Sequence, residues 1–216
     1  MKIQILISNN SWANNYKTFI KKKLKRYSSR VLFLNNHKNL KKNYDVNIIF
    51  SYFKKIEKKF FRLSKNNLIL HESNLPKGRG MSPISWQILR GKKNITFSLI
   101  EASEKIDAGK IYFQKKVKFD GTELFNEIKK LQLVNNIKLI QKFLSNKLRI
   151  NKHIKPKIQK GRATYYRLRK PSDSEIKINK SIKSQINLLR ICDFQNYPAF
   201  FYYRKKKFLI KLIKQQ

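Results

Sequence analysis

The stretch NNLILHESNLPKGRGMSPISWQILRG (residues 66–91) decides the fold predicted for this chain. It begins with a strand-length apolar run, NLIL, that leads to His71. A loop rich in proline and glycine follows. SPISWQIL then predicts a helix over residues 83–90, with Ser82 as its N-cap and Pro83 at its first position. An ionisable residue at the carboxyl end of a strand, followed by such a loop and a helix, is typical of the ligand crevice of an open α/β sheet.

Strand and helix patterns alternate on both sides of this stretch. The predicted strands are residues 3–8, 31–36, 45–53, 67–71, 94–102 and 111–119. The predicted helices are residues 14–27, 54–63, 83–90 and 122–146. This alternation indicates βαβ units and predicts an α/β fold with an open, mostly parallel sheet flanked by helices.

The remainder of the chain predicts a small C-terminal appendage. We expect a first domain over residues 1–148, a basic linker over residues 149–162 that proline and glycine punctuate, and a small subdomain over residues 163–216. Within the subdomain we expect a helix at about 179–190, followed by two short strands around a basic turn.

Composition narrows the class of protein. The chain has 216 residues, 41% of them apolar, which suffices for a real core. Its single cysteine, Cys192, excludes an internal disulfide and a cysteine-rich zinc site, and we expect no metal site. No signal-peptide pattern and no run of about 20 apolar residues occurs. We therefore expect a cytoplasmic protein without membrane insertion.

The net charge of +39 has two interpretations. It can reflect a polyanionic partner such as nucleic acid, an anionic membrane or a phosphorylated substrate. It can also reflect a drift in composition, because lysine, asparagine, isoleucine and phenylalanine are abundant along the whole chain and the lysines gather in no single motif. Under either interpretation the protein would attract anionic small molecules.

HESNLPKGRG, SPISWQILRG and the later DAGKI together resemble the formyltransferase family that uses N10-formyltetrahydrofolate. The residues that carry the resemblance are His71, Ser73, Leu75, Pro76, Arg79, Gly80, Asp107, Gly109 and Ile111. The resemblance covers about residues 45–145 and implies a Rossmann-like fold. The C-terminal part is similar to the branch of the family that formylates nucleotide-linked sugars and, more loosely, to the branch that acts on methionyl-tRNA.

The resemblance implies that His71 and Asp107 are catalytic. Attack of an amine on a formyl group develops an oxyanion, which a positioned donor stabilises. An imidazole can donate a hydrogen bond or a proton near neutral pH. A carboxylate can orient the imidazole or take the proton of the amine, directly or through water. The resemblance further implies that Ser73, Leu75, Pro76, Arg79, Gly80 and Gly109 shape or contact the substrate and cofactor site.

Three of these residues also have a structural interpretation. His71 could be a hydrogen-bonded histidine at a strand end, Asp107 a turn residue, and Arg79 either a phosphate ligand or a solvated side chain. Trp86 is expected in the core. We expect His37 and His153 on the surface, because their neighbours in the sequence are polar and basic.

One position departs from the family pattern. The family has an asparagine two residues before the histidine, where this chain has Ile69. Asn67 would share a face of the strand with His71 but lie about 13 Å back along it. Another polar group could fill the role (Ser73, Asn74 and Ser98 are the nearest candidates), His71 and Asp107 could act alone, or the activity could be weakened or lost. The segment before His71 is also shorter than in the family.

The resemblance implies formyl transfer to a primary amine. We favour the amino group of a nucleotide-linked amino sugar, as in polysaccharide biosynthesis, because we expect no large extra domain for gripping tRNA and because the C-terminal part is similar to the sugar branch. Methionyl-tRNA is the second candidate, and the positive charge is compatible with it. A non-catalytic binding protein on the same scaffold is the third. The resemblance leaves a homodimer open.

Overall fold

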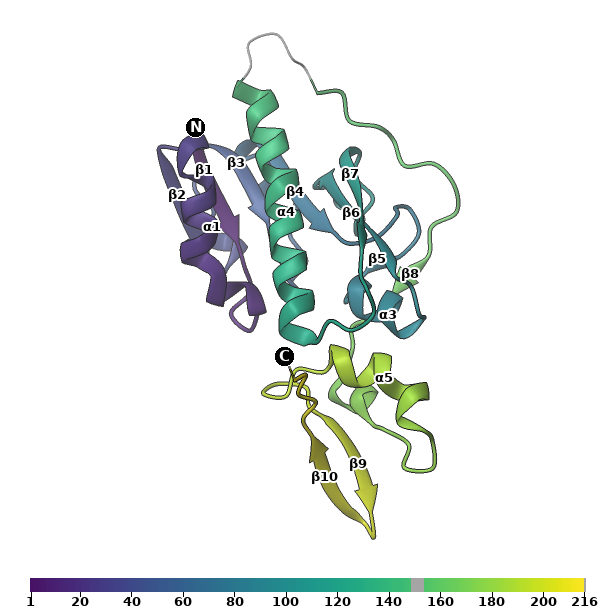
Figure 1. The fold of residues 1–216 in the computed structure, drawn as a ribbon. Coiled ribbons are helices and arrows are strands. Elements are labelled where there is room, and N and C mark those ends of the chain that lie inside the picture. Colours follow the sequence, from purple (N-terminus) through teal and green to yellow (C-terminus); the bar gives the residue numbers. More distant parts are fainter. Residues whose placement is uncertain (149–153, 216) are drawn as a thin grey trace.

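A six-stranded sheet forms the centre of the molecule (Figure 1). The structure is a computed structural model that describes residues 1–148 and 154–215. The strands are β1 (Lys2–Leu6), β2 (Arg30–Leu34), β3 (Tyr44–Ile49), β4 (Ser64–His71), β6 (Asn94–Glu101) and β7 (Ile111–Lys118), in the order β2-β1-β3-β4-β6-β7. The first four are parallel, whereas β6 runs antiparallel to β4 and β7. This confirms the predicted open, mostly parallel sheet.

The two faces of the sheet carry cores of different size. Successive strand residues point to opposite faces, so Leu68 and Leu70 of β4 enter the large core, whereas Ile69 packs against the small one. Helices α1 (Lys17–Leu24), α3 (Pro83–Leu89) and α4 (Phe125–Leu148) contribute to the large core. The one-turn helix α2 (Lys58–Phe61) supplies part of the small core.

Helix α4 crosses the face of the sheet that bears the large core (Figure 1). Its apolar stripe is buried as its helical spacing predicts, for example at Ile137 and Ile140. The helix also buries polar side chains, namely Gln132, Asn135 and Asn136. Buried amides require hydrogen-bond partners, and two of these residues, Gln132 and Asn136, line a cavity.

Three local predictions differ from the structure. Residues 54–57 are not helical, so the helix predicted over 54–63 shrinks to α2. Ser82 stands at the N-cap of α3, but it has φ +52° and its side chain makes no capping hydrogen bond. Trp86 is half-buried outside the cores, and the guanidinium of Arg167 lies 4.7 Å from its ring centroid.

His37 is buried, which makes its predicted surface position wrong. Its Nδ1 lies 2.7 Å from the Tyr52 hydroxyl, and its Nε2 lies 2.8 Å from Glu57 Oε2. Its ring packs edge-on against Phe60. These partners lie 15 or more positions away along the chain, so the local sequence could not show them. His153 lies outside the described residues.

The C-terminal part returns along the molecule before it forms its own small elements (Figure 1). Residues Tyr165–Tyr166 (β8) pair in parallel with Arg79–Gly80 (β5). The C-terminal part also contains helix α5 (Ile182–Ile191) and strands β9 (Ala199–Tyr203) and β10 (Lys206–Ile210). Short 3₁₀ turns occur along the chain: η1 (Trp12–Tyr16), η2 (Lys25–Tyr27), η3 (His37–Asn39) and η4 (Pro171–Ser174). The antiparallel pairing of β9 with β10 confirms the predicted hairpin around a basic turn.

A buried ion pair joins α5 to the segment before α4. Arg190 donates from Nη2 to Glu123 Oε2 (2.9 Å) and from Nε to the Glu123 carbonyl (2.9 Å). The predicted division into two domains and a linker remains a prediction, and residues 149–153 of the linker lie outside the described residues. In the described part of the chain, no helix has the length and apolar character needed to cross a membrane.

Candidate active site

A cavity of about 560 Å³ opens at the carboxyl ends of β3 and β4. Its walls come from segments that are distant in sequence: the ends of β3 and β4, the loops after them, the loop before β7, helix α4 and the return segment at β8. The lining segments are 49–56, 69–72, 80–85, 103–104, 106–107 and 165–168, with Trp12, Phe61, Lys129, Gln132 and Asn136. The position agrees with the crevice that the strand-loop-helix pattern predicted.

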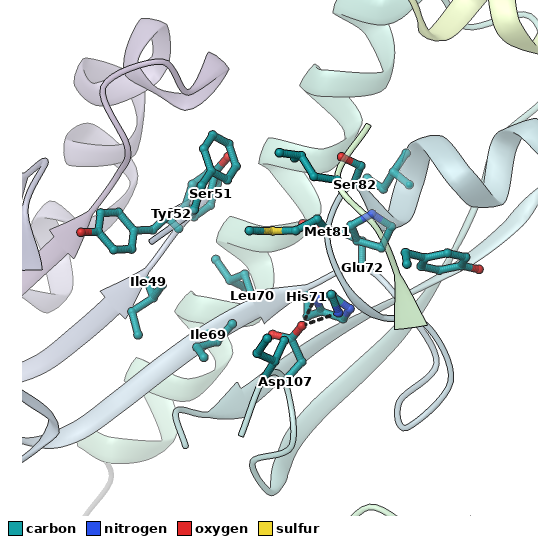
Figure 2. Close-up of a pocket in the computed structure, with 18 of the residues that line it drawn as sticks. Ile49, Ser51, Tyr52, Ile69, Leu70, His71, Glu72, Met81, Ser82 and Asp107 are labelled. Carbon is teal, nitrogen blue, oxygen red and sulfur yellow. Dashed lines mark hydrogen bonds and ion pairs between the residues drawn. The ribbon is translucent and has the colours of Figure 1, made fainter. Parts of the chain in front are cut away.

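His71 and Asp107 meet in this cavity wall (Figure 2). His71 is buried, and its Nε2 lies 2.7 Å from the carbonyl oxygen of Gly78. Because a carbonyl oxygen only accepts hydrogen bonds, Nε2 must carry a proton. Nδ1 is therefore the ring nitrogen that can gain or lose a proton, and it lies 3.5 Å from Asp107 Oδ2. The pair can exchange protons with each other and with a group bound beside them.

The loop before β7 holds Asp107 in place. Asp107 has φ +47°, a conformation that aspartate tolerates better than most residues, and its Oδ2 accepts a hydrogen bond of 2.8 Å from the backbone N–H of Gly80. The side chain of Gln159 donates to the carbonyl oxygens of Asp107 and Gly109. Gly109 is buried against β6, where an added Cβ would lie 1.7 Å from the Glu101 carbonyl oxygen.

The remaining predicted residues build the loop between β4 and α3. Of the residues predicted to contact substrate or cofactor, Gly80 lines the cavity; the others do not. Ser73, Leu75 and Pro76 are buried, and the Leu75–Pro76 peptide is cis. Arg79 donates to Gln159 Oε1 from Nη2 (2.7 Å) and Nε (3.2 Å). Its guanidinium therefore ties the loop to the return segment.

Ile69 occupies the cavity wall where the family pattern has an amide. Asn67 does not line the cavity, and its side chain donates to the Phe61 and Ser64 carbonyl oxygens. The three alternatives named from the sequence, Ser73, Asn74 and Ser98, do not line it either. Neither Asn67 nor any of these alternatives therefore supplies a polar group to the cavity wall.

Four polar side chains of the wall were missed by the sequence analysis: Glu72, Lys129, Gln132 and Asn136. Lys129, Gln132 and Asn136 are spaced by three and four residues, which places them on one side of α4. A polar row beside the apolar stripe of a core helix is a signal that could have been found. Burial lowers the pKa of Lys129 to about 8, while the carboxylate of Glu72 opposes the shift.

The opposite part of the wall is apolar and suits a flat ring. Ile49, Ile56, Phe61 and Ile69 line it, with Ser51 and Ser103 as small polar groups. Ligand sites commonly combine apolar walls with a few polar groups that fix orientation. The exposed Lys54 and Lys55 add positive charge to the same wall.

Tyr52 connects this wall to buried His37. The Tyr52 hydroxyl contacts both the backbone N–H (3.2 Å) and Nδ1 (2.7 Å) of His37. Phe53 donates its backbone N–H to Ser8 Oγ (2.9 Å). These hydrogen bonds hold residues 51–53 in an irregular path at the cavity wall.

Comparison with known proteins gives a family match. A family model described as "Formyl transferase" matches residues 7–141. Methionyl-tRNA formyltransferase of Prochlorococcus marinus (strain MIT 9215) is 30% identical over 170 residues, which are 72% of this chain and 51% of that protein. The bifunctional polymyxin resistance protein ArnA of Wigglesworthia glossinidia brevipalpis is 30% identical over 88% of this chain and 30% of its own length. The chain thus spans about half, or less, of these relatives.

Solved structures share the fold. Methionyl-tRNA formyltransferase from Clostridium thermocellum superposes with a TM-score of 0.80 at 23% identity, covering 100% of this chain and 94% of that chain. A 4-N formyltransferase from Francisella tularensis gives a TM-score of 0.68 at 18% identity, covering 100% and 98%. HypX from Aquifex aeolicus in complex with tetrahydrofolic acid gives 0.75 at 18% identity, covering 98% and 37%. At these identities the likeness shows the fold alone.

Proposed function

The chain belongs to the formyl transferase family, and we propose on that premise that it transfers a formyl group from N10-formyltetrahydrofolate to a primary amine. The observation that carries the proposal is the His71–Asp107 pair in the wall of the cavity. A proton-exchanging pair beside a cavity of about 560 Å³ is what general acid-base chemistry on a bound substrate requires.

The apolar wall supports the choice of donor. When bound, N10-formyltetrahydrofolate supplies the carbonyl group that an amine attacks. Ile49, Ile56, Phe61 and Ile69 would hold its flat ring. The structure of HypX with tetrahydrofolic acid, which has the same fold, adds support for a folate in such a cavity.

Asp107 and His71 would take up and pass on the protons that move during the reaction. An amine loses a proton as it becomes an amide, and Asp107 Oδ2 would receive that proton or pass it to His71 Nδ1, 3.5 Å away. As the bond between the formyl carbon and N10 breaks, N10 of the departing tetrahydrofolate would take up this proton. Nε2 of His71 keeps its proton and donates it in a hydrogen bond to the Gly78 carbonyl oxygen, and this bond fixes the orientation of the ring. A protonated His71 would stabilise negative charge that develops on oxygen beside it.

For the acceptor we propose the amino group of a nucleotide-linked amino sugar. The positive charge around the cavity, to which Lys54 and Lys55 contribute, would attract such an anionic substrate by long-range electrostatics. The fold shared with the Francisella tularensis 4-N formyltransferase over the whole of this chain is compatible with this acceptor.

Methionyl-tRNA is the second candidate acceptor. The names of several relatives at about 30% identity favour it, and so does the net charge of +39, because phosphate contacts dominate affinity for nucleic acids. The isoleucine at position 69 motivates a third candidate, a binding protein of weakened activity on the same scaffold.

Release of tetrahydrofolate tests these candidates. The full chain is incubated with N10-formyltetrahydrofolate and either a panel of nucleotide-linked amino sugars or methionyl-tRNA. We expect turnover with an amino-sugar nucleotide and a loss of about 10²-fold or more in kcat for His71→Ala and for Asp107→Asn. Glu175→Gln, a substitution at a half-buried side chain outside the cavity, serves as the control. Equal rates for the natural protein and His71→Ala across the panel would contradict the enzymatic proposal.

A further inference from the structure

We propose that Glu72 and Asn136 form the subsite that receives the sugar ring of the acceptor, with the carboxylate and the amide oxygen accepting hydrogen bonds from its hydroxyl groups. The inference rests on the proposed function and assigns a substrate-binding role to residues outside the family motif.

The first observation is a hydrogen bond between the two side chains. Asn136 Nδ2 donates to Glu72 Oε1 at 2.7 Å, and both residues are buried. The bond orients the Asn136 amide, because only its nitrogen can donate to the carboxylate. The amide oxygen is thereby assigned as an acceptor, next to a carboxylate whose second oxygen also accepts.

The second observation is that the amide oxygen of Asn136 lacks a hydrogen-bond donor in the described part of the chain. Asn136 is 2% exposed, and its Oδ1 has no hydrogen-bond partner among residues 1–148 and 154–215. A buried polar atom without a partner costs about 1–3 kcal/mol. Since Asn136 lines the cavity, a hydroxyl group bound there can supply the missing donor.

The third observation is the division of the cavity by β4. His71 and Ile69 belong to one face of this strand, whereas Leu70 belongs to the face that α4 covers. Glu72 reaches α4 through Asn136. The polar subsite therefore lies on the α4 side of His71, and the apolar wall proposed for the folate ring lies on the other. An acceptor on the α4 side and a formyl donor on the opposite side would meet at His71 and Asp107, which line the cavity with Glu72 (Figure 2).

The surroundings of the pair suit a sugar ring. The indole of Trp12 lines the same cavity and contributes an aromatic ring, with the Lys129 ammonium group 5.0 Å from its ring centroid. Lys129 donates from Nζ to Gln132 Oε1 (3.0 Å), which orients the Gln132 amide nitrogen as a donor. An aromatic face combined with charged and amide acceptors and an amide donor matches a ring that carries several hydroxyl groups.

Steady-state kinetics with Glu72→Gln tests the inference. The acceptor is a nucleotide-linked amino sugar, compared with an analogue that lacks one ring hydroxyl. We expect Glu72→Gln to raise the KM for the acceptor about 10-fold or more and to change the KM for N10-formyltetrahydrofolate less than about 2-fold, since a neutral amide is a weaker acceptor than a carboxylate. The natural protein should discriminate against the deoxy analogue, and Glu72→Gln should lose most of that discrimination.

Asn136→Leu and Glu175→Gln complete the set. Asn136→Leu removes the amide at similar volume and should also raise the acceptor KM, whereas Glu175→Gln should leave both KM values unchanged. Thermal midpoints identify variants that fail to fold. If folded Glu72→Gln and Asn136→Leu keep the natural acceptor KM, the subsite is wrong while the proposed reaction stands.

The proposed function can fail separately. If the natural protein formylates methionyl-tRNA and no amino sugar, the acceptor class and the subsite are both wrong. If the natural protein turns over neither acceptor, isothermal titration calorimetry measures the affinity of the natural protein and of Glu72→Gln for the amino-sugar nucleotide. A 10-fold weaker affinity of Glu72→Gln supports the subsite on a non-catalytic protein, and absence of binding to the natural protein overturns it.

Discussion

Lys129 shows how burial in the cavity wall changes the pKa of a single side chain. Its ammonium group lies 5.0 Å from the ring centroid of Trp12 and 5.4 Å from that of Phe125. Burial there lowers its pKa to about 8, and the negative charges of Glu72 and Asp193 only partly counteract the shift. A cationic site with this pKa loses charge just above neutral pH.

The pKa of Lys129 predicts a pH-dependent stability. Because the unfolded chain keeps the proton up to a pKa of 10.5, the unfolded state binds more protons than the native state between about pH 8 and 10.5. The free energy of unfolding should therefore rise with pH in this window, relative to Lys129→Met, by at most about 3 kcal/mol. Urea unfolding of both proteins at pH 7 and pH 10 measures the difference. A constant difference would show that the ammonium group is well hydrated in the native state.

The short β5–β8 pair shows how a two-residue element closes the site. β5 lies in the loop after His71, and β8 belongs to the return segment. Arg79 N–H donates to the Thr164 carbonyl oxygen (2.9 Å), and Gly80 presents its own N–H to Asp107. The element therefore connects the loop, the return segment and the carboxylate in one hydrogen-bonded unit.

Gly80→Ala tests this element, and Gly91→Ala is its matched control. Both glycines have positive φ, so both substitutions strain the backbone. At Gly80 the new Cβ would also lie 2.3 Å from the Tyr166 carbonyl oxygen, whereas at Gly91 it meets no atom within 4 Å. We expect Gly91→Ala to cost about 1 kcal/mol of unfolding free energy and to keep kcat. Gly80→Ala should cost more and lower kcat, because it displaces the donor to Asp107. Similar effects of both substitutions on kcat would contradict this role of β5.

At the scale of the whole molecule, the excess of positive charge affects how anionic substrates associate with the protein. Lysine and arginine number 51 against 12 acidic residues, so the field of the chain favours any anionic substrate. The structure places Lys54 and Lys55 in the cavity wall, and a basic turn joins β9 to β10 away from the cavity.

The salt dependence of the acceptor KM separates the two acceptor classes. A protein that neutralises 6–10 phosphates loses about 10³–10⁵ in affinity between 50 and 200 mM salt. A nucleotide sugar carries few phosphates, so we expect the acceptor KM to rise less than about 10-fold over this range. The measurement is the rate of tetrahydrofolate release at varied acceptor and potassium chloride concentrations. A steep loss with methionyl-tRNA as the working acceptor would favour the second candidate.

The sequence by itself determined the local and periodic features. Alternating strands and helices predicted the sheet, and the stretch around His71 predicted a crevice at a strand end. Asp107 was predicted from the motif DAGKI, which carries part of the family resemblance, although no local pattern shows that it would lie 3.5 Å from His71. The prediction of the sheet succeeded because strand alternation, helix periodicity and turn residues act over a few neighbouring positions.

Only the tertiary structure decided which side chains share the cavity. It buried His37 against Tyr52 and Glu57, joined Glu72 to Asn136 from 64 positions away, and brought Gln159 to the loop of Asp107. It also showed that Ser73, Asn74 and Ser98 do not line the cavity beside Ile69. The physical reason is that hydrogen bonds between distant segments form only after strand pairing and core packing have set their relative positions, and no local sequence pattern encodes those contacts.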